Sequence, residues 1–201
     1  MDMKYVFFPV VLIIILLSTY TTTFAASPDS TNGSLGIMAS YWGTIKNTPG
    51  LRLGIEKTYF QSTKYSVIGS ATLQMNRKPD IYTSAGFNFG NTLRRTWKRG
   101  FYLEHGINIG YLGRYYDFDI YRTNSDGNII NVGRKWNSTM ILGYSIGMGY
   151  DFTQKTNTNV KLFLKPGIFY DLLNRTNYYY VNNYSIEIGV VLHPQWLIRN
   201  K

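Results

Sequence analysis

The sequence predicts an all-β fold, an eight-stranded antiparallel up-and-down transmembrane β-barrel. Three observations predict it: a two-residue alternation of side chains, the positions of the glycines and a leader-like N-terminus. The alternation is clearest in residues 139–151, where large apolar side chains alternate with small or polar ones. Successive side chains of a strand point to opposite faces, so this stretch predicts one long strand. Its large side chains are Met140, Leu142, Tyr144, Ile146, Met148 and Tyr150.

The glycines indicate which face of each predicted strand points into the barrel. Gly86, Gly143, Gly147 and others lie opposite the bulky residues of their own strands. The interior of an eight-stranded barrel has room only for packed side chains, so the small residues belong inside. The bulky residues are then expected to face lipid, which is the polar-in, apolar-out pattern of transmembrane barrels.

Six charged residues share the inward face and form a predicted lumenal charge network. Because three are basic and three acidic, we expect salt bridges in a plugged interior, since an unpaired buried charge is costly. Each glutamate is expected to contact one of the three basic residues. A narrow pore that conducts ions through these charges is an alternative. The network is Arg52, Glu56, Glu104, Lys161, Lys165 and Glu187.

Residues 1–25 have the features of a signal peptide. Lys4 precedes an apolar run from Tyr5 to Leu17, and small residues follow up to Ala25. A membrane anchor is the alternative, but a spanning helix needs about 20 apolar residues. Cleavage after Ala25 leaves a flexible lead-in at 26–34, the barrel at 35–193 and a C-terminal tail at 194–201. The chain has no cysteine, which excludes a lipid-anchored lipoprotein, a disulfide scaffold and a thiolate metal site.

Turn-forming residues divide the barrel region into eight strands, an even number as in bacterial barrels. The first five are predicted at 35–45, 51–60, 65–75, 81–91 and from Phe101 onward. Residues 139–151, 159–170 and 178–192 complete the set. Leu93 to Gly100 is predicted to be a basic connection. Pro166 cannot donate to a ladder and therefore predicts a bulge or kink in the seventh strand.

The longest gap, between the fifth and sixth strands, contains Ser125-Asp126-Gly127-Asn128. Asp-Gly favours a two-residue hairpin turn, which would set Tyr121 opposite Val132, Asn108 opposite Ser145 and Gly110 opposite Gly143. Both strands then exceed the about 9–11 residues that cross a membrane, so a long hairpin should protrude. Both chain ends are expected in the periplasm, and successive connections alternate between the two sides of the membrane. The connection between the fifth and sixth strands is therefore predicted to be extracellular. Its candidate binding residues for a protein partner are Tyr115, Tyr116, Phe118, Ile120, Tyr121, Ile129, Ile130 and Val132.

Leader, strand number and alternation together resemble those of the small outer-membrane β-barrels of the OmpA and OmpX type. The resemblance covers the mature chain and implies a porin-like integral protein of a Gram-negative outer membrane, exposed at the cell surface. It implies contact with outer-membrane lipids, including lipopolysaccharide. Residues 196–201 depart from the terminal aromatic residue that those barrels usually have. Although the net charge is +10, we expect no nucleic-acid partner of an exported barrel, and we expect a monomer.

Enzymes of this architecture modify lipid A, so the two histidines of the chain are the candidate catalytic residues. His105 follows Glu104, and adjacent strand residues face opposite ways, so the two cannot form a dyad. His193 lies beyond the last predicted strand and is expected at the surface. We therefore predict a non-enzymatic protein with no catalytic residues, no metal and no cofactor. A lipid A-modifying or other lipid-processing enzyme remains an alternative.

The densest basic cluster is predicted on the periplasmic side of the membrane. It is a candidate site for anionic lipid headgroups, with its tryptophan at the interface. An ordinary solvated turn is the alternative. The cluster is Arg94, Arg95, Trp97, Lys98 and Arg99.

Overall fold

The computed structural model describes residues 35–44, 48–119, 121–131, 133, 136–154, 158–172 and 182–194. The predicted signal peptide and lead-in, and all of the predicted tail except Pro194, lie outside these residues.

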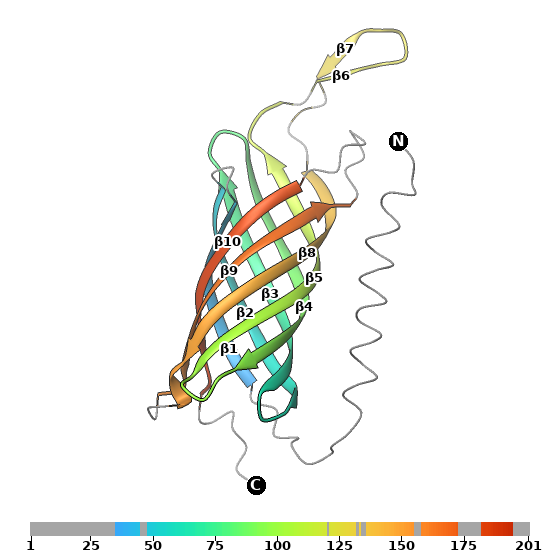
Figure 1. Cartoon of the computed structure of the whole chain (residues 1–201). Helices are drawn as coiled ribbons and strands as arrows, with labels where there is room; N and C mark the ends of the chain where they lie inside the picture. The colour runs from blue at the N-terminus through green and yellow to red at the C-terminus, as the bar shows by residue number, and fades with distance from the viewer. Residues whose placement is uncertain are drawn as a thin grey trace, which may run out of the picture. The chain divides into compact units, whose positions relative to one another are not determined.

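Eight strands form one closed antiparallel barrel in the order β1-β10-β9-β8-β5-β4-β3-β2 (Figure 1). Each barrel strand pairs with the next one along the chain, and β10 closes the barrel on β1. The predicted fold class is therefore confirmed. The strands are β1 (Leu35–Thr44), β2 (Thr48–Gln61), β3 (Tyr65–Lys78), β4 (Tyr82–Thr96), β5 (Phe101–Tyr116), β8 (Trp136–Asp151), β9 (Val160–Asp171) and β10 (Asn182–Leu192).

Three short elements complete the described residues. Strands β6 (Tyr121–Thr123) and β7 (Ile129–Asn131) form a separate two-stranded sheet, and η1 (Phe152–Gln154) is a 3-10 turn. No helix in the described part of the chain is long and apolar enough to cross a membrane.

The bulky side chains point away from the barrel axis. Leu73 is 68% exposed and Ile146 is 55% exposed, although both are large and apolar. In contrast, Gly143 and Gly147 are buried, and Glu104 is only 4% exposed. This arrangement is the reverse of a water-soluble barrel and is the pattern of a barrel whose outer wall contacts hydrocarbon.

The inward glycines allow neighbouring backbones and side chains to approach closely. A Cβ atom at Gly86 would overlap the carbonyl oxygen of Tyr111, and one at Gly149 would overlap that of Leu162. Outward-facing Gly69 would meet only the ring of Tyr59. Glycine is therefore a packing requirement on the crowded inner face.

The predicted basic connection at Leu93 to Gly100 is wrong in its first half, because β4 continues to Thr96. The alternation of β4 runs through this segment, so Arg94 points inward and Arg95 outward. Only residues 97–100 form the turn to β5.

The predicted continuous hairpin between the fifth and sixth strands is not confirmed. The ladder between β5 and β8 ends at the pair Tyr115 and Trp136, and β6 and β7 pair separately. Tyr121 pairs with Asn131 rather than Val132, and Asn108 pairs with Gly143 rather than Ser145. Gly110 likewise pairs with Ile141 rather than Gly143.

The length of the turn explains the register of the β6–β7 hairpin. The backbone N–H of Asn124 donates to the carbonyl of Asn128 at 2.9 Å, which leaves three residues in the loop. The third of them, Gly127, has a φ of 83°, as expected of a three-residue hairpin that ends in a left-handed residue. The predicted two-residue turn is therefore one residue too short.

Pro166 of β9 interrupts the ladder between β8 and β9 without introducing a bulge. The pairs Ser145 with Gly167 and Met148 with Leu164 have the same register on either side of it. Its other neighbour, Ile186 of β10, remains paired with it. The strand is continuous, so the predicted bulge is wrong and the count of eight strands holds.

Candidate functional site

The candidate site is the lumen, which receives every second side chain of the barrel strands. Among the described residues, five basic and five acidic side chains are buried or nearly buried there, so their formal charges cancel. They comprise Arg52, Arg94, Arg114, Lys161 and Lys165 with Glu56, Glu104, Asp151, Asp171 and Glu187. The predicted set of six is thus part of a larger network.

Arg94 is the centre of the network at the terminal end of the barrel, the end at which β1 begins and β10 ends. Its Nε donates to Glu104 Oε2 at 2.7 Å, and its Nη2 lies 3.4 Å from Glu56 Oε2. Its guanidinium carbon lies 4.4 Å from the centre of the Tyr102 ring. Lys165 Nζ binds the other oxygen of Glu104 at 2.8 Å. One buried carboxylate is thereby shared between two cations.

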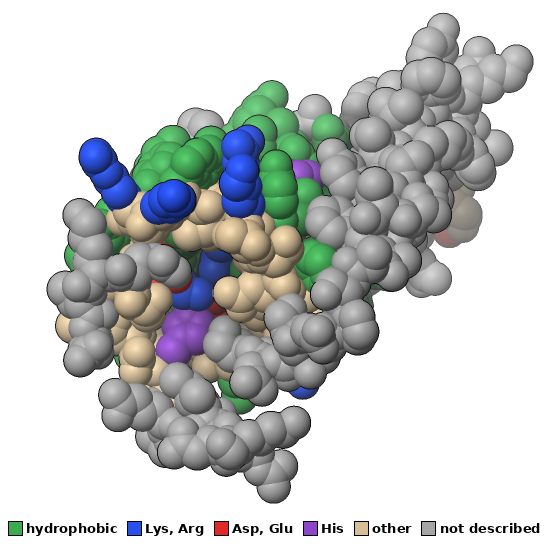
Figure 2. Space-filling view, turned by 60° about the horizontal axis from the view of Figure 1, so that its bottom comes forward, with side chains coloured by type: hydrophobic (Ala, Val, Ile, Leu, Met, Phe, Trp, Pro, Cys, Tyr) green, Lys and Arg blue, Asp and Glu red, His purple; other side chains and the backbone are tan. Residues whose placement is uncertain are grey.

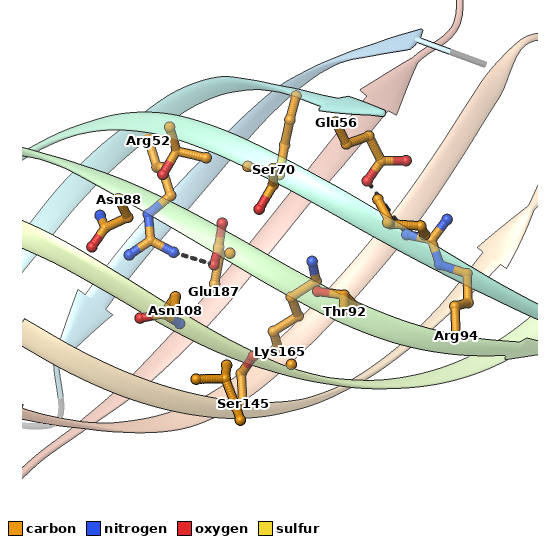
Figure 3. A pocket seen from close by; sticks show the side chains of 16 residues that line it. Arg52, Glu56, Ser70, Asn88, Thr92, Arg94, Asn108, Ser145, Lys165 and Glu187 are labelled. Carbon is orange, nitrogen blue, oxygen red and sulfur yellow. Dashed lines mark hydrogen bonds and ion pairs between the residues drawn. The ribbon is translucent and has the colours of Figure 1, made fainter. Parts of the chain in front are cut away.

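Arg52 is the centre of a second group of lumenal contacts, and Figure 3 shows its interaction with Glu187. It binds Glu187 Oε2 at 2.6 Å and Gln74 Oε1 at 2.7 Å. Ser40 Oγ donates to the other oxygen of Glu187 at 2.6 Å. Asn88 Nδ2 donates to Gln74 Oε1 at 2.8 Å. A charged pair is thus joined to neutral hydrogen-bonding groups, as buried charges require.

Two further ion pairs lie nearer the ends of the lumen. Arg114 Nη2 lies 2.9 Å from Asp171 Oδ2, and Lys161 Nζ lies 3.6 Å from Asp151 Oδ2. The chain positions of Arg114 and Asp171 place this pair at the end opposite the terminal end.

The pairing of the predicted lumenal charges differs from the expectation at one glutamate. Glu104 contacts Lys165 and Glu187 contacts Arg52, as expected. Glu56 instead contacts Arg94, a residue predicted to bind lipid headgroups. Arg94 is only 3% exposed and cannot belong to a surface cluster.

His193 is in the lumen and not at the surface as predicted. It is 5% exposed, and its Nε2 lies 3.8 Å from Glu56 Oε1. The alternation of β10 continues past Leu192, and the backbone N–H of His193 donates to the Asn159 carbonyl at 2.9 Å.

Small cavities lie within the lumen, and Arg52 lines two of them. One of about 40 Å³ is lined by residues that include Arg52, Glu56, Arg94 and Lys165, and a second of about 30 Å³ lies beside Phe169. A water molecule needs roughly 10–15 Å³ measured in this way, so each has room for only a few waters.

Apolar side chains narrow the lumen at two levels along the barrel axis. One cluster lies nearer the terminal end and the other nearer the opposite end. The first cluster is Met38, Tyr102, Phe163 and Val191, and the second is Trp42, Leu112, Ile141 and Phe169.

The candidate hairpin residues are divided between the barrel and the small sheet. Tyr115 and Tyr116 end β5, and the Tyr116 ring lies 6.0 Å from the Tyr82 ring and 5.6 Å from the Phe118 ring. Tyr121, Ile129 and Ile130 belong to β6 and β7, and these three are exposed. Ile120 and Val132 lie outside the described residues.

The remaining basic candidates and His105 lie on the outside of the barrel. Arg95, Trp97, Lys98 and Arg99 are exposed at the terminal end. His105 is half-buried on the outer wall, where its ring lies 6.3 Å from the Tyr144 ring. The backbone of β5 therefore separates His105 from the lumenal Glu104.

Strand alternation was the signal that could have identified the lumenal residues that were missed. Arg114 and Asp151 continue the inward parity of β5 and β8, and Asp171 continues that of β9. Arg94 and His193 likewise continue β4 and β10. Asp151, Asp171, Arg94 and His193 lie at or just beyond the ends of predicted strands, and Arg114 lies in the predicted protruding hairpin, which is why they were missed.

No model of a protein family matches the chain, and no curated protein matches it either. Among solved structures, neisserial surface protein A is 15% identical with a TM-score of 0.50, and the alignment covers 81% of this chain and 97% of that one. Ail, the attachment invasion locus protein of Yersinia pestis, is 12% identical with a TM-score of 0.44, covering 80% and 96%.

The N-terminal barrel domain of Pseudomonas aeruginosa OprF is 15% identical with a TM-score of 0.40, and the alignment covers 80% of this chain and 98% of that one. At sequence identities this low, the comparison is evidence about the fold and not about the activity. The resemblance predicted from the sequence is confirmed at this level: the chain has the fold of the small eight-stranded outer-membrane β-barrels.

Proposed function

We propose that this chain is an integral, non-enzymatic protein of a bacterial outer membrane. Its barrel serves as a sealed anchor, and the connection from 117 to 135 presents a binding hairpin at the cell surface. The observation that carries the proposal is the pairing of buried charges in the lumen inside an exposed apolar wall.

The lumenal contacts support a barrel that does not conduct ions. Each of the five lumenal carboxylates is within 4 Å of a basic side chain. Conduction needs sites that an ion can enter and leave, whereas these charges already neutralise one another at close range. The cavities of about 40 and 30 Å³ beside Arg52 each have room for only a few waters.

The small sheet supports the binding role of the hairpin. In the described part of the chain, β6 and β7 pair only with each other, so each has an outer edge with no strand beside it. Unpaired strand edges are templates for an extended segment of another protein. Tyr121 is 64% exposed and Ile129 is 75% exposed, which provides apolar side chains beside those edges.

Single-channel recording in planar bilayers tests the sealed lumen. Folding of the purified barrel is first verified by its faster migration in unheated than in heated gel samples. We expect no stepwise current from the folded barrel. The positive control is the double variant Trp42→Ala, Phe169→Ala. It lacks two of the large side chains that narrow the lumen and should therefore show current steps. Discrete current steps from the unmodified folded barrel would instead identify a pore.

Replacing residues 117–135 with Asn-Gly tests the hairpin. Because Tyr115 and Trp136 already form the last pair of the β5–β8 ladder, the shortened barrel should keep its heat-dependent mobility. Cells that display the two forms are then tested against a library of extended peptides. The intact chain should enrich peptides and the shortened chain should not. Equal enrichment by both forms would exclude the hairpin as the binding element.

A further inference from the structure

Five exposed basic side chains gather at the terminal end of the barrel, and we refer to them as the basic belt. They come from β2, from the β2–β3 turn, from β4 and from the β4–β5 turn, which are adjacent in the barrel. Figure 2 shows basic side chains projecting from one side of this end. The basic belt consists of Lys57, Lys64, Arg95, Lys98 and Arg99.

Backbone hydrogen bonds hold the two turns of the basic belt together. The N–H of Thr96 donates to the carbonyl of Lys64 at 2.9 Å, which joins the end of β4 to the β2–β3 turn. Within the second turn, the N–H of Gly100 donates to the carbonyl of Trp97 at 2.9 Å, and Gly100 has a φ of 88°. The basic side chains therefore project from a fixed scaffold.

The basic belt is a region of one charge sign. Among the described residues at the terminal end, the acidic side chains Glu56, Glu104 and Asp151 face the lumen and are paired there. At the opposite end, charges outside the lumen are mixed, with Arg77 and Lys78 near Asp80 in the sequence. Since the lumenal charges cancel, the net charge of +10 belongs to the rest of the chain, and the basic belt supplies five of its positive charges.

Aromatic and apolar side chains lie directly beside the basic belt. The Arg95 guanidinium carbon lies 5.0 Å from the centre of the Trp97 ring and 5.7 Å from that of Tyr65. The Trp97 and Phe101 rings are 5.5 Å apart. Phe101 and Leu103, which are 40% and 41% exposed, then begin the apolar outer wall. Along β4 and β5, Lys98 and Arg99 of the turn are therefore followed by the Trp97 and Phe101 rings, and then by Arg95 paired with Leu103 at the start of the apolar wall.

We propose that the basic belt binds the phosphate headgroups of anionic phospholipids in the leaflet at the terminal end of the barrel. The cations neutralise the phosphate, Trp97 and Tyr65 lie at the depth of the headgroup, and the acyl chains pack along the wall that begins at Phe101 and Leu103. A soluble polyanion would make no use of that wall, so the combination favours a lipid. This inference rests on the proposed membrane location.

Tryptophan quenching by brominated lipids tests the inference, because Trp97 is part of the site. The chain has four tryptophans, and replacing Trp42, Trp136 and Trp196 by Phe leaves Trp97 as the reporter. The chain is inserted into phosphatidylcholine vesicles that contain brominated phosphatidylglycerol or brominated phosphatidylcholine. We expect phosphatidylglycerol to be preferred at Trp97. Changing all five belt residues to Gln should lower that preference by at least about tenfold.

The matched control is Arg77→Gln with Lys78→Gln at the opposite end, which should leave the preference at Trp97 unchanged. An unchanged preference in the five-residue variant would overturn the inference, as would equal quenching by the two lipids in the unmodified belt. Displacement of the brominated phosphatidylglycerol by inorganic phosphate at the same concentration would instead identify a site for soluble anions.

Insertion into pure phosphatidylcholine vesicles, followed by heat-dependent gel mobility, separates this inference from the proposed function. A chain that inserts without preferring phosphatidylglycerol contradicts the lipid site alone. A chain that does not insert contradicts both.

Discussion

At the scale of single residues, Arg94 and Arg95 show how strongly strand alternation determines the surroundings of a side chain. They are the same residue type at successive positions of β4. Arg94 is 3% exposed and contacts two carboxylates, whereas Arg95 is exposed beside Trp97. Their roles therefore differ because adjacent side chains of a barrel strand lie on opposite sides of its wall.

Arg94→Met should lower the free energy of unfolding by about 3–5 kcal/mol, because Glu56 loses its arginine and remains buried. Arg95→Met, the matched control, should change it by less than about 0.5 kcal/mol. Urea titration of the barrel in pure phosphatidylcholine vesicles, which offer Arg95 no anionic lipid, measures both values. The double variant Arg94→Met with Glu56→Met should regain part of the loss. Equal effects of the two single substitutions would contradict the lumenal role of Arg94.

At the scale of elements, the β6–β7 hairpin depends on the conformation of its turn. Asn124 Oδ1 accepts the N–H groups of Asp126 and Asn128 at 3.0 and 2.9 Å, and Gly127 completes the loop with its positive φ. A Cβ atom at Gly127 would meet nothing within 4 Å. Any penalty for a side chain there therefore comes from the backbone alone.

Gly127→Val should destabilise the hairpin by about 1–2 kcal/mol, since a β-branched residue resists a positive φ. Gly127→Asn should be tolerated, because asparagine adopts this conformation more readily. Hydrogen exchange of the amides in β6 and β7 measures the local effect, and exchange in the barrel strands should stay unchanged. Equal protection of the hairpin in the Val and Asn variants would show that the positive φ is not required.

The sequence predicted the strands better than their ends and registers. Alternation identified all eight barrel strands, because a period of two persists over each of them. The density of basic residues from Leu93 onward concealed the end of β4. Gly127 suits a two-residue or a three-residue loop, so the turn length could not be read from the Asp-Gly pair. Choosing Arg94 as the partner of Glu56 required the closed barrel, because the two lie on β2 and β4 with β3 between them.

At the scale of the whole molecule, the barrel separates its side chains by polarity in the reverse of a water-soluble protein. Ten formal charges cancel in pairs around the axis, and large apolar residues such as Leu73, Phe89 and Ile146 cover the outer wall. Only a surrounding solvent of low polarity makes this arrangement favourable. The proposed anchoring, sealing and lipid-binding roles all depend on that outer wall being in hydrocarbon.

Spin labelling of the outer wall tests this claim most directly. The chain has no cysteine, so Leu73→Cys, Phe89→Cys and Ile146→Cys each introduce a single labelling site, and Asp126→Cys in the hairpin turn provides an aqueous reference. For the barrel in lipid vesicles, we predict that labels at the three wall positions collide more often with oxygen than with a water-soluble nickel complex, and that the label at 126 shows the opposite preference. Labels at 73, 89 and 146 that favour the nickel complex would place the outer wall in water and contradict the account.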